Sequence, residues 1–109
     1  MNVTIDVKEK DGIFYVKLTG EIDAYTAPKV KERLMDLADG DGVTINIDLS
    51  GVKYMDSTGL GVFVGLFKQL SARSGNMKLT GMSERLQRLF DITGLADVMD
   101  INTEVEGGV

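Results

Sequence analysis

Ser57 is the side chain in this sequence whose surroundings most suggest chemistry. It lies in YMDSTGLGVFVGLF, residues 54–67, between Asp56 and an apolar run interrupted by glycine. Serine and aspartate are both preferred helix caps, so either residue could begin a helix here without any further role. The free N–H groups and the positive dipole end of a helix N-terminus also favour a phosphate. Ser57 is therefore a candidate phosphate site as well as a candidate cap.

The absence of cysteine and histidine narrows the other chemistry open to the chain. Without them there is no disulfide, no thiolate metal site and no imidazole, which is the commonest general base. An enzyme would have to rely on carboxylates such as Glu21 and Asp23, in a polar stretch typical of a solvated loop. The phosphate-binding pattern G-x-x-x-x-G-K is also missing. We therefore predict a protein that is not an enzyme and holds neither a metal nor another cofactor.

The overall composition is that of one small acidic domain. The 109 residues are 43% hydrophobic and 27% charged, which is typical of a chain with a real core. The net charge of −5 argues against nucleic acid as a partner, because contacts to phosphates need a basic patch. No apolar run is long enough for a signal peptide or a membrane span. We expect a single cytoplasmic domain over residues 1–109, with 104–109 as a flexible tail.

Hydropathy patterning predicts alternating strands and helices. Strands are indicated where apolar and polar residues alternate, and helices where apolar residues recur on one face. We expect a hairpin at 2–19 turning at Asp11-Gly12, a loop at 19–28, a helix at 27–38 capped by Thr26, a strand at 43–49, a helix at 57–72, a strand around 77–79, and a helix capped by Ser83 and ended by Gly94. Residues 95–101 could form a helical turn or a short strand.

This order, β-β-α-β-α-β-α, predicts an α/β fold with a mostly parallel sheet, an antiparallel edge hairpin and helices packed on the sheet. It delivers Ser57 to the carboxyl end of a parallel strand. That end of the sheet is where α/β folds bind their ligands.

The helix predicted at 57–72 is apolar over a wide arc. The residues that must face the sheet are Leu60, Phe63, Val64, Phe67 and Leu70, and Val62 and Leu66 extend this arc. Gly61 and Gly65 lie on a separate stripe of small residues, although glycine inside a helix costs ~1 kcal/mol relative to alanine. Either these glycines allow close packing within the domain, or they leave a bare face for a partner beside Val62 and Leu66. We expect Gly61, in the first turn, to be the more exposed of the two.

The sequence resembles the anti-sigma factor antagonists built on the STAS domain, the sulfate-transporter and anti-sigma-antagonist domain. The resemblance covers nearly the whole chain, and its most specific piece is MDSTGLG at 55–61. The other stretches that carry it are GEID at 20–23, TAP at 26–28, IDLSGVKYMDSTGLGVFVGLFK at 47–68 and SERLQRLFDITGL at 83–95. The match is closer to the general-stress, sigma-B branch of the family than to its sporulation branch. The family fold agrees with the predicted element order.

The resemblance implies that this protein works by exchanging partners. Without phosphate, it would bind an anti-sigma factor that is also an ATP-dependent serine kinase, and so release the sigma factor for transcription. The kinase would phosphorylate the serine matching Ser57, ending the binding, and a PP2C-type phosphatase would reverse this. Asp23 would lie near that serine, and the motif surrounds it with Asp56, Thr58 and Gly59.

The charge of one phosphate is large enough to operate such a switch. It adds about −1.5 to −2 charges, which a helix N-terminus tolerates in the free protein. Buried in an interface beside Asp23 and Asp56, the same charge would cost roughly 2–5 kcal/mol. Reversing a partition from 1:99 to 99:1 takes about 5.5 kcal/mol, so no large refolding is needed. We expect a monomer when free, with Gly61, Val62, Gly65 and Leu66 as the candidate partner-binding residues.

A rival interpretation is a response-regulator receiver domain phosphorylated on Asp48. INIDLSGVKYMDSTG resembles, superficially, a strand that carries a phosphoacceptor aspartate. Receiver chemistry also needs an acidic pair after the first strand to hold Mg²⁺, and VTIDVKEKDG ends in a turn without one. By the alternating pattern Asp48 is an ordinary polar residue of a strand. A regulatory fragment of a sulfate transporter is a further alternative, weakened by the missing membrane segments.

Overall fold

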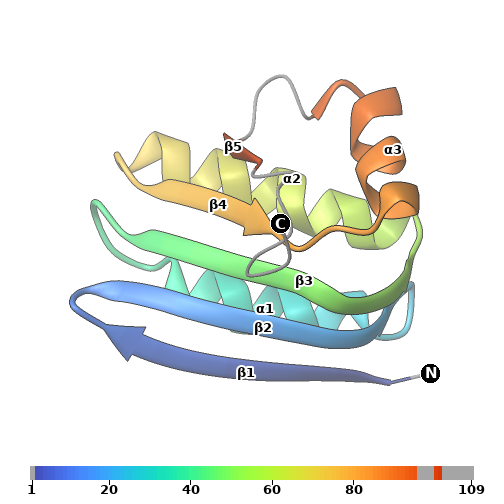
Figure 1. Cartoon of the computed structure of the whole chain (residues 1–109). Helices are drawn as coiled ribbons and strands as arrows, with labels where there is room; N and C mark the ends of the chain where they lie inside the picture. Colours follow the sequence, from blue (N-terminus) through green and yellow to red (C-terminus); the bar gives the residue numbers. More distant parts are fainter. Residues whose placement is uncertain (1, 96–99, 102–109) are drawn as a thin grey trace.

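The computed structural model describes residues 2–95 and 100–101, which form a sheet with two long helices against one face (Figure 1). The elements are β1 (Val3–Lys10), β2 (Ile13–Ile22), α1 (Ala27–Leu37), β3 (Thr44–Met55), α2 (Ser57–Ala72), β4 (Asn76–Thr80), α3 (Glu84–Ile92) and β5 (Asp100–Ile101). The strand order is β1-β2-β3-β4-β5, with β1 antiparallel to β2 and the other pairs parallel. The predicted fold class is confirmed, and the tail predicted at 104–109 lies outside the described residues.

The hairpin and the last strand follow from local backbone preferences. Asp11 and Gly12 both have positive φ, 55° and 80°, as a tight turn between antiparallel strands requires. Gly94, just past α3, has φ 78°, as expected for the residue that ends a helix. Of the two structures considered for 95–101, a short strand is present at Asp100–Ile101, which pairs with β4.

Strands β2 and β3 are longer at their carboxyl ends than the hydropathy pattern predicts. The loop expected at 19–28 is wrong over its first residues, because β2 continues to Ile22 and pairs with β3 as far as Met55. Register shifts between Lys17 and Thr19, and again between Gly20 and Glu21, interrupt the alternation that would have revealed the extension.

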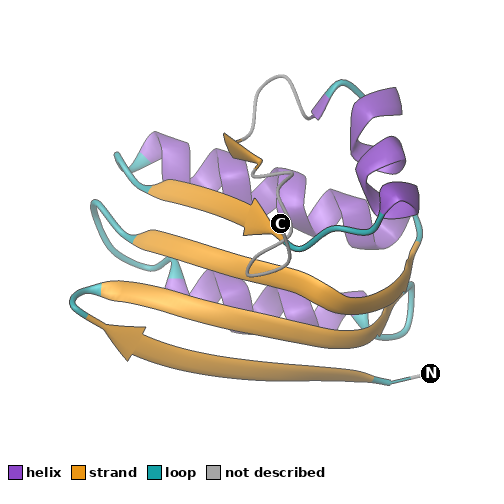
Figure 2. Cartoon of the chain, viewed as in Figure 1, coloured by secondary structure: helices purple, strands orange, loops and turns teal. Residues whose placement is uncertain are grey.

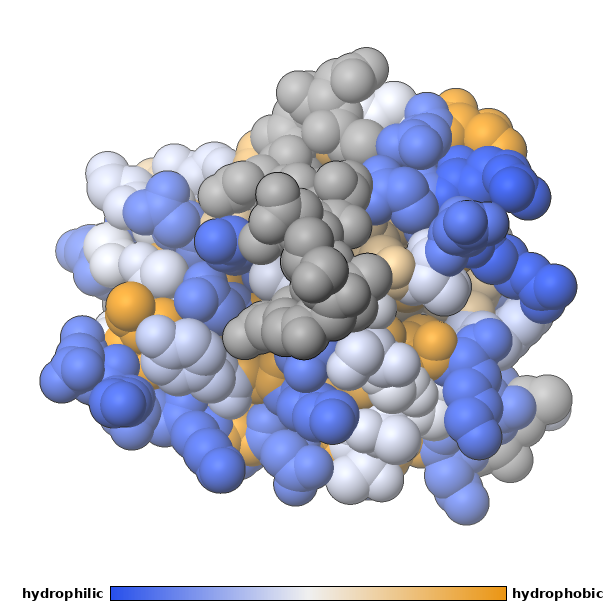
Figure 3. All heavy atoms as spheres, in the orientation of Figure 1, coloured by the Kyte–Doolittle hydropathy of each residue, from blue (hydrophilic) through white to orange (hydrophobic). Residues whose placement is uncertain are grey.

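Figure 2 shows the two long helices against one face of the sheet, and the core consists of apolar side chains of these helices, of α3 and of the strands. In β2 the buried Val16 and Leu18 alternate with the exposed Tyr15, Lys17 and Thr19, so the second face carries polar side chains. Figure 3 views that second face, where the visible surface is mostly hydrophilic. Among the described residues no helix covers it, and none of their helices is long and apolar enough to cross a membrane.

Helix α3 closes the core beside α2. The Ser83 hydroxyl accepts a hydrogen bond from the Leu86 N–H at 3.2 Å, which confirms Ser83 as the cap of this helix. Leu86 and Phe90, one turn apart, are its buried residues. The Phe90 ring meets Phe63 of α2 with centroids 6.3 Å apart in a tilted arrangement that aromatic pairs favour.

The side of α2 that carries Val62 and Leu66 faces α1. Val62 is 5% exposed and Leu66 is fully buried. Residues at spacings of three and four share a helix face, and on this one the Gln69 amide donates to the Ala38 carbonyl at the end of α1. The expectation that Val62 and Leu66 supply exposed apolar surface to a partner is therefore wrong, because α1 covers them.

The glycines of α2 serve different purposes. A Cβ at Gly59 would lie 2.7 Å from the Ile22 carbonyl oxygen, so close packing of α2 on β2 requires glycine there. At Gly65 a Cβ would lie 3.3 Å from the end of Met35 in α1, a tight fit. At Gly61 it would meet nothing within 4 Å, and this residue is exposed, as expected.

Alanine at positions 59 and 61 should change stability in opposite directions. Gly59→Ala must displace backbone, and overpacking of this kind costs ~1–3 kcal/mol. Gly61→Ala enters open space and should raise the free energy of unfolding by up to ~1 kcal/mol, through helix propensity. Urea denaturation of both variants and the unmodified chain measures this difference. Equal effects at the two positions would contradict the packing described.

Candidate functional site

Asp56, and not Ser57, caps helix α2. Its Oδ1 accepts hydrogen bonds from the backbone N–H groups of Thr58 and Gly59, both at 3.0 Å. Ser57 is the first residue of the helix, and its side chain is exposed, as is that of Thr58. Since the aspartate provides the cap, capping does not explain the serine. Ser57 stands in solvent at the positive end of a helix of 16 residues.

Asp23 begins a compact turn between β2 and α1. Its Oδ1 accepts from the N–H groups of Tyr25 at 2.9 Å and Thr26 at 3.1 Å. The Thr26 hydroxyl accepts from the Asp23 N–H at 2.9 Å and donates to the Glu21 carbonyl at 2.8 Å. Thr26 occupies the N-cap position of α1, as predicted, but its hydroxyl holds the preceding turn and makes no cap hydrogen bond.

The carboxylate of Asp23 is buried and charged. It is 5% exposed, and burial by itself would raise its pKa. The N–H groups of Thr26 and Tyr25 and the Thr26 hydroxyl outweigh burial, so the pKa of Asp23 lies below its ordinary value of 3.8. Its second oxygen, Oδ2, is buried without a hydrogen-bond partner among the described residues. A buried acceptor on an ionised group therefore lies unused in this turn.

Parallel pairing brings the Asp23 turn beside the start of α2. Ile22 pairs with Met55 at the carboxyl ends of β2 and β3, so Asp23 and Asp56 leave the sheet next to each other. The Asp56 N–H also donates to the Ile22 carbonyl at 3.2 Å. The two acids singled out with Ser57 therefore lie on adjacent segments, where both carboxylates add negative charge near the serine.

Two aromatic side chains near this site were missed by the sequence reasoning. Tyr25, in the Asp23 turn, is 87% exposed, and Tyr54, three residues before Ser57, is 48% exposed. Large apolar side chains held in solvent on both segments that form the site suggest a surface made for contact. The available signal was an aromatic residue in each of two otherwise polar stretches.

A local hydrogen bond accounts for Asp48 without receiver chemistry. This residue lies within β3, where its Oδ1 accepts from the Ser50 N–H at 2.8 Å. A Cβ at Gly81 would lie 2.7 Å from this Oδ1, so the carboxylate packs closely against the backbone of that glycine. The strand order 1-2-3-4-5 also differs from the 2-1-3-4-5 order of a receiver.

Comparison with known proteins agrees with the fold and the motif. The model of the STAS domain family matches residues 4–107. This chain belongs to the STAS domain family. It is 52% identical over 109 residues to the anti-sigma-B factor antagonist of Bacillus subtilis (strain 168), covering 100% of this chain and 99% of that protein.

A second relative and a solved structure extend the comparison. The anti-sigma-B factor antagonist of Listeria monocytogenes is 54% identical over 108 residues, which are 98% of this chain and 94% of that protein. The crystal structure of an anti-sigma factor antagonist from Mycobacterium paratuberculosis superimposes with a TM-score of 0.83 at 26% identity, covering 97% of this chain and 90% of that one. The resemblance stated from the motifs is confirmed.

The lowered pKa of Asp23 predicts a pH-dependent contribution to stability. A carboxylate whose pKa is lower in the folded state than in the unfolded state stabilises the fold at any pH above the unfolded-state pKa. This stabilisation is lost as the pH falls through the folded-state pKa. Asp23→Asn should therefore lower the free energy of unfolding at neutral pH, and its deficit should shrink as the pH falls below 3.8. Urea titrations over a pH series measure this. Asp36→Asn, at an exposed position of α1, is the control, and an Asp23→Asn deficit independent of pH would contradict the assignment.

Proposed function

We propose that this chain is an anti-sigma factor antagonist whose binding is switched by phosphorylation of Ser57. In its unphosphorylated form it binds an anti-sigma factor that is also a serine kinase, which releases a sigma factor for transcription. Phosphorylation ends the binding, and a PP2C-type phosphatase removes the phosphate and restores the binding form. The chain acts as a monomeric regulator in the cytoplasm, without catalysis of its own. Identities of 52% and 54% to proteins named anti-sigma-B factor antagonist, over at least 98% of this chain, support the proposal and favour the sigma-B branch.

The observation that carries the proposal is the division of roles between Asp56 and Ser57. Because Asp56 makes the cap hydrogen bonds, the serine hydroxyl can be modified without removing them. A phosphate there gains from the helix dipole in the free protein. In the complex it would be enclosed beside the carboxylates of Asp56 and Asp23, at a cost of roughly 2–5 kcal/mol. Phosphorylation therefore weakens binding by electrostatics, without a new fold.

The proposed partner-binding surface on α2 contains fewer residues than the sequence pattern predicted. Val62 and Leu66 are in the core and Gly65 packs toward Met35, so the exposed Gly61 is what remains of that face. One turn after Ser57, it lets a partner approach the helix backbone closely. Thr58 adds to this exposed first turn.

Asp23 is proposed to adjust kinase contact and phosphotransfer and to hold no metal. Its carboxylate is charged and lies beside the start of α2, so it adds to the negative charge that the kinase meets there. Asp23→Asn keeps an acceptor for the turn but loses the charge. If this variant folds normally and keeps its phosphorylation rate and its affinity for the kinase, Asp23 does not belong to the site.

Ser57 should be the single phosphoacceptor, although Thr58 is next to it and also exposed. Incubation with the cognate anti-sigma kinase and ATP should add one phosphate, located by tandem mass spectrometry. Ser57→Ala should abolish the labelling and retain binding to the unmodified kinase, since the cap belongs to Asp56. Thr58→Val is the matched control and should be phosphorylated normally. Phosphate on Thr58, or unchanged labelling of Ser57→Ala, would disprove the assignment.

A side chain at Gly61 should weaken kinase binding while the fold survives. Gly61→Val places two methyl groups where the partner approaches, and no atom of this chain lies within 4 Å of the new Cβ. Ser71→Val is the control for valine in α2, since it is also exposed but about 15 Å further along the helix. Urea midpoint and kinase affinity are measured on the same preparations. Normal affinity of Gly61→Val would remove this face from the interface.

A further inference from the structure

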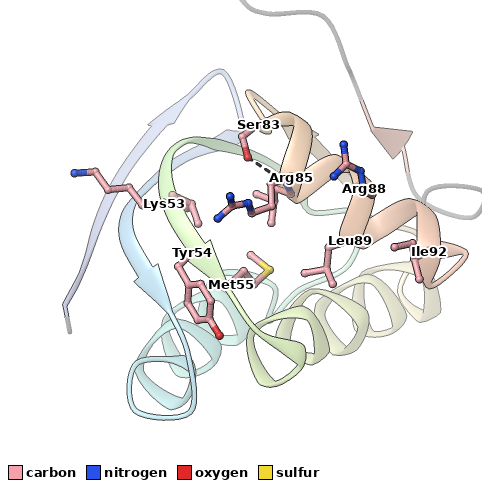
Figure 4. A pocket seen from close by; sticks show the side chains of 10 residues that line it. Lys53, Tyr54, Met55, Ser83, Arg85, Arg88, Leu89 and Ile92 are labelled. Atoms are coloured by element: carbon pink, nitrogen blue, oxygen red, sulfur yellow. Dashed lines mark hydrogen bonds between the residues drawn. The ribbon is translucent and has the colours of Figure 1, made fainter.

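An apolar groove lies between the end of β3 and α3. It encloses about 220 Å³ and is lined on the β3 side by Tyr54 and Met55 and on the α3 side by Leu89 and Ile92. Figure 4 shows Met55 and Leu89 facing each other across its floor, with the Arg85 side chain extending from α3 over the groove. Ile92 at its edge is 76% exposed. This groove offers a place for an apolar side chain that none of the described residues fills.

The basic residues of α3 line the groove, whereas its acids do not. Arg85, Arg88 and Ile92 recur at spacings of three and four and belong to the lining. Glu84 and Asp91 are outside the lining, and Asp91 accepts a hydrogen bond from the Gln87 amide at 3.0 Å. The groove is therefore bordered by positive charge in a chain whose net charge is −5.

These cations have no acidic partner within the described part of the chain. The ion pairs found there both belong to Arg73, which contacts Asp39 and Asp41 at 3.2 and 3.0 Å. Arg85 and Arg88 thus pair with none of the described acids. An apolar groove edged by guanidinium groups is complementary to a segment that combines an apolar anchor with carboxylates.

The groove begins close to the proposed phosphorylation site. Met55, which lines it, is two residues before Ser57, so their Cα atoms lie within about 8 Å of each other. A partner that contacts Ser57 is therefore close enough to contact the groove as well. A phosphate at Ser57 would also repel an acidic segment lying there.

We propose that this groove binds an acidic segment of the anti-sigma factor, with an apolar side chain between Met55 and Leu89 and carboxylates beside Arg85 and Arg88. The inference rests on the proposed function and adds a second contact region, on α3, to the one around Ser57. In this arrangement the charges of α3 supply the salt-dependent part of the binding affinity, and Ser57 supplies the control by phosphorylation.

The test measures affinity for the purified anti-sigma-B factor of Bacillus subtilis by titration calorimetry, with the unphosphorylated full chain. The double variant Arg85→Gln with Arg88→Gln should weaken binding at least about tenfold at low salt, and its affinity should depend less on salt than that of the unmodified chain. Lys29→Gln with Arg33→Gln is the matched control, because it removes the same charge from exposed positions of α1. Ile92→Ser should weaken binding and leave the salt dependence unchanged.

The outcomes separate the groove from the proposed function. If the unmodified chain does not bind this factor, the proposed function fails, and the groove assignment with it. If it binds and the Arg85 and Arg88 variant binds equally well, the groove assignment alone is overturned. Equal losses in both double variants would show a general charge effect and also overturn it. Self-association that disappears in the Arg85 and Arg88 variant would assign the groove to a second copy, against the proposal.

Discussion

The site depends on the parallel pairing of β2 with β3, which continues to the last residue of both strands. Ile22 and Met55 are partners there, and the hydrogen bond from Asp56 to the Ile22 carbonyl joins the two segments just beyond the sheet. Everything proposed for the site follows from that junction. It sets Asp23 beside the first turn of α2, and it requires glycine at position 59, because the helix passes so close to β2. A shift of register would separate the two acids and close the space that the helix needs.

The sequence predicts the elements well where side chains alternate, and fails where the backbone departs from regular pairing. The hairpin, α1 and α2 were predictable because their apolar residues follow periods of two or of 3.6. The ends of β2 and β3 were not, since bulges near Thr19 and Glu21 break the period and Gly20 resembles a turn residue. Register shifts are set by contacts between strands, which a single-sequence pattern does not contain.

The sequence pattern was also insufficient to predict the roles of the residues at the site. Ser57 and its neighbouring acid could be identified from residue types and from the motif, whereas their separate roles could not. Asp56 and Ser57 are equally good caps on paper, and only the backbone conformation at Asp56 decides between them. Likewise, Val62 and Leu66 seemed free for a partner because the pattern shows how wide an apolar arc is, without showing that α1 covers one side of it. The groove beside α3 was hidden for a related reason, since its lining comes from segments about thirty residues apart in the chain.

The cap at Asp56 has a consequence for how often the proposed switch can be used. The hydrogen bonds that begin α2 come from Asp56 and not from the proposed phosphoacceptor, so adding and removing a phosphate would leave the cap in place. Neither form of the molecule would then expose a frayed start of α2 to proteases. The ratio of the two forms can thus record the balance of kinase and phosphatase over many cycles, without being distorted by selective loss of one form.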